Sequence, residues 1–255
     1  MLKNAVSLVT GGASGLGRAT VEHFFRAGSR VILADLPTSE GGKVATELGK
    51  GVTFVPMDVL SEEDVGKVLE VTKNQFGRLD ITVNCAGIAF PEKVYDFKQD
   101  KPHTLDSFRQ ILNVNTVGTF NVIRLVAGLM AKNAPNADGQ RGVIVNTASV
   151  LGYDAQSGLS AYAASKAAII GMTLPIAREL SGQGIRVVTV APGFFQTQMT
   201  GYLPDKVCQF LISTIPFPKR AGRPAEFARF VEAIVENPLL NGEVIRLDGA
   251  ARFNV

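Results

Sequence analysis

Short apolar runs alternate along the chain with longer stretches in which apolar residues recur at helical spacing. The runs predict strands at 5–10, 30–34, 52–56, 80–84, 143–148, 186–190 and 243–247. Helices are predicted between them, as at 16–27. Because strands that alternate with helices form right-handed βαβ units, we expect an α/β fold with a doubly wound parallel sheet and helices on both faces.

Length and charge narrow the class of protein. With 255 residues and no visible linker, repeat or low-complexity tract, we predict a single domain over 1–255. The formal net charge is +3, and no run of like charges indicates nucleic-acid binding. The 2 cysteines fit a reducing compartment, and no metal site is predicted. No apolar stretch is long enough for a membrane span, and residues 1–4 leave no room for a cleavable signal.

A hydroxyl, a phenol and an ammonium group are predicted to converge late in the chain. Ser149 closes the apolar run 143–148, which delivers its hydroxyl at the carboxyl end of a strand. Tyr162 and Lys166 stand four apart in an alanine-rich segment, so in a helix they share one face. The alternative is a Tyr and a Lys that merely share a helix.

These three groups suit proton transfer to or from an alcohol. An ammonium about 4 Å from a phenol contributes about 4 kcal/mol at an effective dielectric of 20. That interaction is enough to lower the pKa of Tyr162 by as much as about 3, before desolvation offsets part of the change. We therefore predict Tyr162 as general base, with Ser149 holding the substrate oxygen and Lys166 also reaching a cofactor ribose.

A glycine-rich turn follows the first predicted strand and leads into a helix. Gly11, Gly15 and Gly17 follow the spacing G-x3-G-x-G. Their missing Cβ atoms allow backbone N–H groups, including those at Ser14 and Leu16, to approach a pyrophosphate. A tight turn without a ligand is the alternative.

An acidic residue, Asp35, ends the second predicted strand about 20 residues beyond the glycines. A carboxylate there accepts hydrogen bonds from the adenosine ribose and repels a 2′-phosphate, so NAD is favoured over NADP. Arg18 is the opposing cation near the turn, although its place on the first helical turn favours a solvent-facing side chain. A helix N-cap or turn residue before Pro37 is the alternative role for Asp35.

Two further strand ends are predicted to border the cofactor. After the third strand, Asp58 is placed to hydrogen-bond the exocyclic amine of adenine and Val59 to pack on its ring. The segment that follows reads equally well as a capped helix start. After the fourth strand, the backbone of Cys85, Ala86 and Gly87 is expected to run beside the cofactor, with the thiol packing rather than reacting.

Two segments in the middle of the chain carry weaker signals. Residues 90–104 are mostly polar with three lysines, and we predict a solvated loop. Contact with an anionic substrate tail is its alternative. In the following helix, Asn115 is a poor helix former and is predicted to lie at a local break, holding a water beside Lys166. An Asn that bonds its own helix backbone is the alternative.

The sixth strand is followed by Pro192 and Gly193, which are predicted to turn the chain over the nicotinamide. There the Phe195 backbone and the Thr197 hydroxyl can meet the carboxamide. Apolar residues then recur at helical spacing, which predicts a lid around 194–222 that suits an apolar substrate. Plain core packing is the equal alternative.

Taken together, these motifs resemble the short-chain dehydrogenase/reductase family across essentially the whole chain. They are Thr10-Gly11-x3-Gly15-x-Gly17, Asn84-x-Ala86-Gly87, Asn115, Ser149, Tyr162-x3-Lys166 and Pro192-Gly193. The resemblance implies a Rossmann-type fold with seven parallel strands, hydride transfer to or from nicotinamide, and usually a homotetramer. It also implies a catalytic tetrad of Asn115, Ser149, Tyr162 and Lys166.

Longer blocks resemble one group within this family, the mitochondrial NAD-linked dehydrogenases of 3-hydroxyacyl-CoA thioesters and steroid alcohols. The blocks are 121–128, 139–149, 171–178, 215–218 and 236–250. The resemblance implies the same substrates, a mitochondrial location and a possible second role as scaffold in a tRNA-processing complex. An NADPH-linked 3-oxoacyl reductase is the nearest alternative within the family.

The loop 150–160 departs from that group. It reads VLGYDAQSGLS, where the group more usually has a small residue followed by Phe and a second Gln near Leu159. The loop borders the substrate, and we expect Gln156 to bind it together with Ser149 and Tyr162. Substrate preference is therefore the implied property that this loop affects most.

Overall fold

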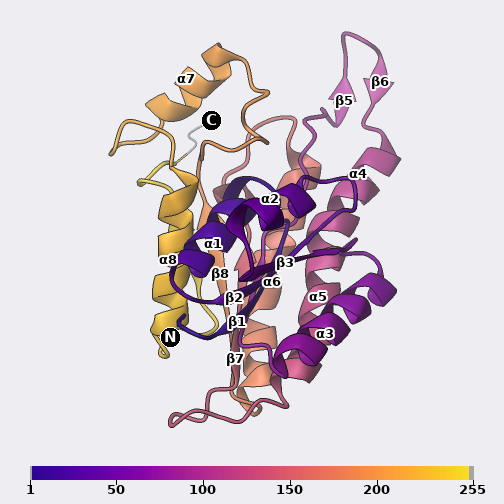
Figure 1. Ribbon diagram of the computed structural model, residues 1–255. Coiled ribbons are helices and arrows are strands. Elements are labelled where there is room, and N and C mark those ends of the chain that lie inside the picture. The colour runs from indigo at the N-terminus through magenta and orange to yellow at the C-terminus, as the bar shows by residue number, and fades with distance from the viewer. Residues whose placement is uncertain (1, 253–255) are drawn as a thin grey trace.

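A parallel sheet runs through the centre of the computed structural model, which describes residues 2–252 (Figure 1). Its strands are β1 (Val6–Thr10), β2 (Arg30–Asp35), β3 (Val52–Pro56), β4 (Ile81–Asn84), β7 (Gly142–Thr147), β8 (Ile185–Pro192) and β9 (Val244–Leu247). They pair in parallel in the order β3-β2-β1-β4-β7-β8-β9. The predicted seven-stranded, doubly wound Rossmann-type sheet is confirmed.

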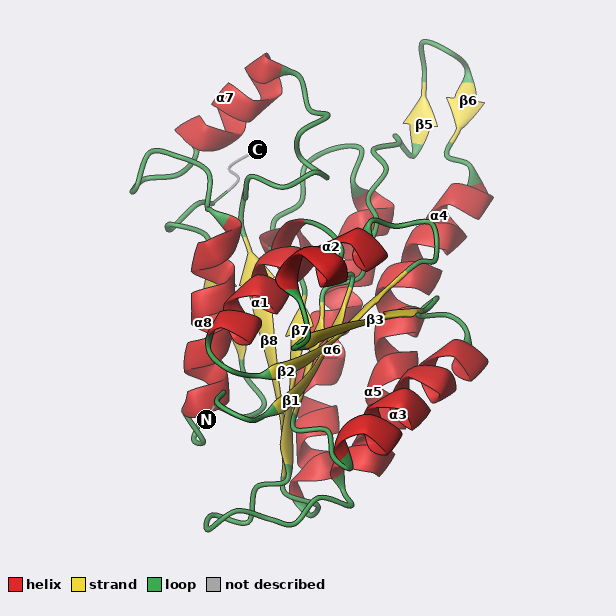
Figure 2. Cartoon of the chain, viewed as in Figure 1, coloured by secondary structure: helices red, strands yellow, loops and turns green. Residues whose placement is uncertain are grey.

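Helices cover both faces of the sheet (Figure 2). One layer contains α1 (Gly15–Arg26), α2 (Gly41–Leu48) and α8 (Pro224–Glu236). The other contains α3 (Glu62–Phe76), α5 (Thr119–Met130) and α6 (Ser160–Ser181). Two apolar cores result, one on each side of the strands.

The central strands are apolar at successive positions because both of their faces are buried. On β1, Leu8 packs in the core beneath α3, α5 and α6, whereas Val9 packs in the core beneath α1 and α8. Both side chains are fully buried. Ile144 and Val145 divide between the two cores in the same way. This double burial explains why apolar runs, rather than alternating patterns, predicted the strands.

The helix that follows residue 104 is interrupted where the sequence predicted a break. It begins as α4 (Leu105–Leu112), widens to a π-helix over Asn113–Gly118 and continues as α5. The predicted local break at Asn115 is confirmed. Single-turn π-helices are often found at functional sites.

The segment 90–104 is more ordered than the predicted loop. It contains a short antiparallel hairpin, β5 (Tyr95–Asp96) with β6 (Lys101–Pro102). The Asp96 carboxylate accepts the backbone N–H groups of Lys98 and Gln99 at 2.9 and 3.3 Å and so closes the turn. The prediction of irregular structure was wrong here, while most of the hairpin is exposed to solvent as expected.

Two elements project from the same end of the molecule, the β5–β6 hairpin and α7 (Asp205–Ser213) (Figure 1). The chain enters them from the carboxyl ends of β4 and β8, so this is the end where ligands of parallel α/β sheets bind. A 3₁₀ turn over Val150–Gly152 follows β7 at the same end. Within residues 2–252, no helix combines the length and apolar character that a membrane crossing requires.

Candidate active site

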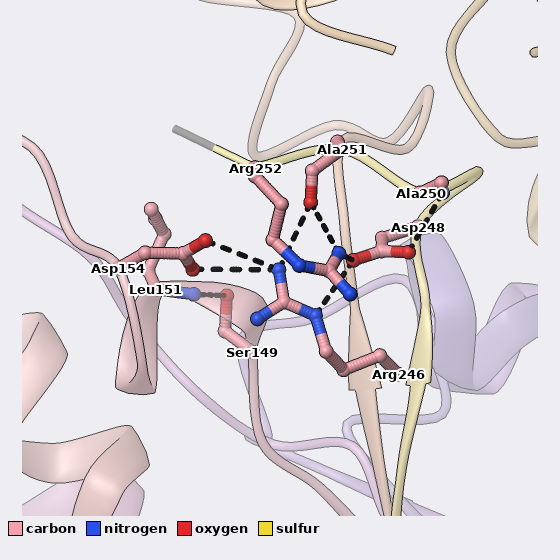
Figure 3. Close-up of polar contacts among 8 residues, drawn as sticks. All are labelled: Ser149, Leu151, Asp154, Arg246, Asp248, Ala250, Ala251 and Arg252. Atoms are coloured by element: carbon pink, nitrogen blue, oxygen red, sulfur yellow. Dashed lines mark hydrogen bonds and ion pairs between the residues drawn. The ribbon is translucent and has the colours of Figure 1, made fainter. Parts of the chain in front are cut away.

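The hydroxyl of Ser149 and the phenol of Tyr162 meet beyond the end of β7. Ser149 precedes the 3₁₀ turn, and its Oγ accepts the N–H of Leu151 at 3.1 Å (Figure 3). Tyr162 lies in the first turn of α6, where its phenol hydrogen-bonds with Ser149. Burial raises the pKa of Tyr162 above its ordinary value, and the bond with Ser149 offsets part of that rise.

Lys166 lies one helical turn beyond Tyr162 and is 5 % exposed. Its Nζ is 5.6 Å from the centroid of the Tyr162 ring and donates to the carbonyl oxygen of Thr147 at 2.8 Å. Burial lowers the pKa of this ammonium group to about 8. The three predicted groups therefore do converge. The predicted lowering of the Tyr162 pKa is wrong for this arrangement, because burial dominates both groups.

Asn115 uses its whole amide to join the π-helix to neighbouring segments. Its Oδ1 accepts the N–H of Ile88 at 2.8 Å, and its Nδ2 donates to the Ile88 carbonyl and to Ser165 Oγ, both at 2.9 Å. The alternative that Asn115 bonds its own helix backbone through its side chain is therefore wrong. A Cβ placed on Gly87 would lie 3.1 Å from Asn115 Oδ1 and 3.5 Å from Lys166 Nζ, so the two groups flank the same small space.

The glycine-rich turn packs against the end of β4. Gly11 has a φ of +64°, and a Cβ on it would lie 2.7 Å from the backbone nitrogen of Ala86 and 2.9 Å from the carbonyl carbon of Cys85. A Cβ on Gly17 would lie 2.1 Å from the Gly11 carbonyl oxygen. Only glycine fits at these two positions. The side chain of Ser14, at the N-cap of α1, does not cap the helix, which leaves its first N–H groups to a ligand.

Asp35 is tied directly to this turn. Its Oδ2 accepts the N–H of Ala13 at 2.9 Å, and its Oδ1 accepts the N–H of Leu36 at 2.8 Å. The Asp35 carboxylate therefore lies beside the glycine-rich turn, as predicted. It also acts as a turn residue through its bond to Leu36, which was the alternative role. Arg18, the opposing cation, donates to Glu22 at 2.9 Å and to Glu47 at 3.1 Å. Two carboxylates therefore balance its charge.

The next strand end carries Asp58 and Val59. Asp58 Oδ1 accepts the N–H of Leu60 at 2.9 Å, which closes a turn. Val59 is buried and packs so closely on Gly118 that a Cβ there would lie 2.5 Å from its Cγ2. Ser61 caps α3 by accepting the N–H of Asp64 at 3.1 Å, so the capped helix start is confirmed.

The Cys85 thiol lies close to Thr147 and is influenced by the charge of Lys166. Thr147 Oγ1 donates to its sulfur at 3.5 Å, and burial raises the pKa of Cys85 to about 11 despite that bond and the nearby Lys166 charge. The thiolate is the reactive form, so burial of the thiol disfavours reaction at this cysteine. A packing role agrees with the sequence prediction.

The segment after β8 folds around Thr200, which the sequence analysis did not identify. Its hydroxyl donates to the carbonyl oxygen of Phe195 at 2.7 Å and accepts the N–H of Thr197 at 3.0 Å. Thr197 reaches the glycine-rich turn, because a Cβ on Gly15 would lie 3.4 Å from its own Cβ. A pocket of about 580 Å³ lies between Gly15 and this segment. Threonines three apart are the one signal that could have marked this turn.

Core packing, the alternative to a lid, explains only part of 194–222. Phe195 and Ile215 are buried, but Met199, Tyr202 and Phe210 are 47 %, 82 % and 54 % exposed. No residue of α7, all of which the structure describes, is buried. These apolar side chains therefore need another explanation than the core.

A family model described as short chain dehydrogenase matches residues 5–207. The match covers most of the sheet, the glycine-rich turn and the Tyr162 helix. The chain belongs to the short-chain dehydrogenase family. It is therefore an oxidoreductase, and its family uses a nicotinamide cofactor.

Relatives of this short-chain dehydrogenase align over nearly their whole length. The 3-hydroxyacyl-CoA dehydrogenase type-2 of Drosophila melanogaster is 64 % identical over 253 residues, covering 99 % of each chain. The human protein of the same name is 56 % identical over 252 residues, 99 % of this chain and 97 % of its own. The crystal structure of 3-hydroxyacyl-CoA dehydrogenase type-2 from Mycobacterium avium is 41 % identical, with a TM-score of 0.93 over 98 % of this chain and 97 % of its own.

The residues present fit a nicotinamide dinucleotide. The glycine positions admit no side chain, the first turn of α1 is uncapped, and the Asp35 carboxylate borders the turn. Within residues 2–252, no group of three His, Cys, Asp or Glu side chains is arranged to hold a metal ion. Sequence reasoning missed Thr147 and Ser165, which hold Lys166 and Asn115, because neither belongs to a motif.

Proposed function

We propose that this short-chain dehydrogenase oxidises secondary alcohols with NAD, and that 3-hydroxyacyl-CoA thioesters are its main substrates, with hydroxysteroids as a second class. The observation that carries the proposal is the meeting of Ser149, Tyr162 and Lys166 at the sheet edge that also holds the glycine-rich turn. The names of the relatives above support the thioester class.

The dinucleotide would lie along the carboxyl ends of the strands. When bound, NAD supplies the hydride acceptor. Its contacts would come from the glycine-rich turn, the ends of β2 and β3 on the adenosine side of the dinucleotide, the end of β4, helix α6 and the segment after β8. The residues are Gly11, Ser14, Gly15, Leu16, Gly17, Asp35, Asp58, Val59, Cys85, Ala86, Gly87, Tyr162, Lys166, Phe195 and Thr197.

NAD rather than NADP is proposed because of the charges around the turn. Asp35 presents a carboxylate beside Ala13, where a 2′-phosphate would be repelled. Arg18, which would attract that phosphate, is already engaged by Glu22 and Glu47. Both features disfavour the NADPH-linked reductase alternative.

The proton path runs through Ser149 and Tyr162. Ser149 fixes the alcohol oxygen by hydrogen bond, and Tyr162 accepts the alcohol proton during oxidation. Because burial raises the pKa of Tyr162, oxidation is expected to accelerate as pH rises, whereas the reverse reduction uses the protonated phenol. Lys166 supplies positive charge beside the phenol, and Asn115 fixes the π-helix next to it.

Substrate selection is proposed to lie in two segments. The residues 194–222 would act as a lid within the single domain, since their exposed apolar side chains suit an acyl chain or a steroid. Gln156, partly buried in the loop before α6, would contact the substrate with Ser149 and Tyr162. The family resemblance further supports a homotetramer and a mitochondrial location.

The test is reduction of NAD over a panel of 3-hydroxyacyl-CoA thioesters and hydroxysteroids at matched concentrations. We expect kcat/KM to be highest for a thioester and activity with NADP to be far lower. Activity only with NADPH and 3-oxoacyl substrates would contradict the proposal.

A further inference from the structure

Four charged side chains form a network beside the loop that carries Ser149 (Figure 3). Arg246 on β9 donates from Nη2 to both oxygens of Asp154, at 3.2 and 3.4 Å, and from Nε to Asp248 Oδ2 at 2.8 Å. Arg252 donates to the same Asp248 oxygen at 2.9 Å. Two guanidinium groups thus balance two carboxylates.

This network is better shielded than an ordinary surface ion pair. The side chains of Arg246, Asp154 and Asp248 are 20 %, 22 % and 6 % exposed. The ring of Tyr153 lies 5.3 Å from the guanidinium carbon of Arg246 and adds a cation–π contact. Partial burial limits screening, and the planar guanidinium fixes the direction of each bond. Arg246 is therefore held in one orientation.

On one side, Arg246 binds Asp154 in the turn that follows Ser149. The N–H of Asp154 donates to the Val150 carbonyl at 3.2 Å, so Asp154 continues the turn that begins at Ser149. The same turn also rests on α6, because a Cβ on Gly152 would lie 3.0 Å from the backbone nitrogen of Ala167. The turn is thus held by contacts with both α6 and Arg246.

On the other side, Arg246 binds Asp248 at the end of β9, which packs on the start of the segment that follows β8. Its partner Asp248 lies against Gly193, where a Cβ would be 2.8 Å from Asp248 Cβ. The N–H of Gly193 donates to Leu247 at 2.9 Å. The chain continues from Gly193 to Thr197, beside the glycine-rich turn. One guanidinium therefore joins the two walls of the active site.

We infer that Arg246 is a positioning residue for hydride transfer: by bridging Asp154 and Asp248, it sets the spacing between the Ser149 loop and the Gly193–Thr197 segment. The inference rests on the proposed alcohol oxidation. Reacting atoms must lie about 3 to 3.5 Å apart, and a misplacement of about 1 Å can slow a reaction about 100-fold. Arg246 acts through its partners and touches no reacting atom.

The test compares Arg246→Gln, Asp154→Asn, their double variant and Arg246→Lys in the full chain. We expect kcat for thioester oxidation to fall about 10- to 100-fold in each single variant, with Kd for NADH within about twofold of wild type. The double variant should lose no more than the worse single one, because both remove the same link. Arg246→Lys should recover part of kcat.

Arg252→Gln is the matched control, because Arg252 binds Asp248 but makes no bond to Asp154. Its kcat should stay within about twofold of wild type, as for a surface substitution. An Arg246→Gln variant with wild-type kcat, or one in which NADH affinity falls in parallel with kcat, overturns the inference. If that variant does not fold, Asp154→Asn decides by the same criteria. A wild-type chain inactive on the whole panel overturns the proposed function itself.

Discussion

Replacing Lys166 by Met should make the protein more stable at neutral pH while removing activity. Lys166 is 5 % exposed, and burial lowers its pKa from 10.5 to about 8. Holding the charged form in the fold therefore costs about 3 kcal/mol of stability. Met fills a similar volume without the charge.

One contact works against this gain. The ammonium donates to the Thr147 carbonyl at 2.8 Å, and that carbonyl loses its partner in the variant. The loss costs about 1 to 2 kcal/mol. Lys166→Met should thus be about 1 to 2 kcal/mol more stable at pH 7. For a chain of this size, that difference raises Tm by about 2 to 8 °C.

The stability difference between Lys166→Met and the wild type should change with pH in a defined direction. The penalty on the wild type is complete below the folded pKa of about 8 and is gone above the unfolded value of 10.5. The advantage of Lys166→Met should therefore shrink above pH 8 and reverse before pH 10.5, once the remaining penalty is smaller than the cost of the unpaired Thr147 carbonyl. The assay is thermal unfolding of both proteins at pH 7 and pH 10.5. Lys132→Met, at an exposed lysine, is the control and should show no such reversal. A variant that is less stable than the wild type at pH 7, or whose stability advantage does not change with pH, would contradict this prediction.

Three further predictions concern the cofactor and the frame of the site. Asp35→Ser should raise the ratio of NADPH to NADH affinity at least about 10-fold, measured as two Kd values, because repulsion of a 2′-phosphate is removed; an unchanged ratio contradicts this. Asn115→Ala should lower the free energy of urea unfolding by about 2 to 4 kcal/mol, since both backbone groups of Ile88 lose their partners. Arg186→Met should lower it by about 2 kcal/mol, because three carbonyls at the end of α8 and beyond lose a buried guanidinium. An unfolding free energy equal to that of the wild type in either variant would contradict the corresponding prediction.

Much of the fold could be predicted because the sheet is buried on both faces. Such strands are apolar throughout, so runs such as 143–148 stand out from the helices between them. The β5–β6 hairpin could not be predicted. Its turn depends on the Asp96 side chain replacing backbone partners, and that contact has no hydrophobic pattern.

The part of the site that could be predicted consists of residues at the end of one strand and on the helix after it. Ser149, Tyr162 and Lys166 meet because only a short 3₁₀ turn and a loop separate β7 from α6, and helical spacing places the last two together. Their pKa directions were not predictable, since they depend on how deeply packing buries each group. The pairing of Asp154 with Arg246 was also out of reach, because the two lie 92 residues apart in sequence and neither belongs to a motif.

The proposed function requires the Tyr162 phenol to move the alcohol proton beside a bound dinucleotide. The most direct measurement is NADH formation from a 3-hydroxyacyl-CoA by Tyr162→Phe, with NADH affinity measured on the same preparation. We expect turnover to fall at least about 100-fold, within the range of general acid–base catalysis, while Kd for NADH stays within about twofold of wild type. Turnover close to that of the wild type would contradict it.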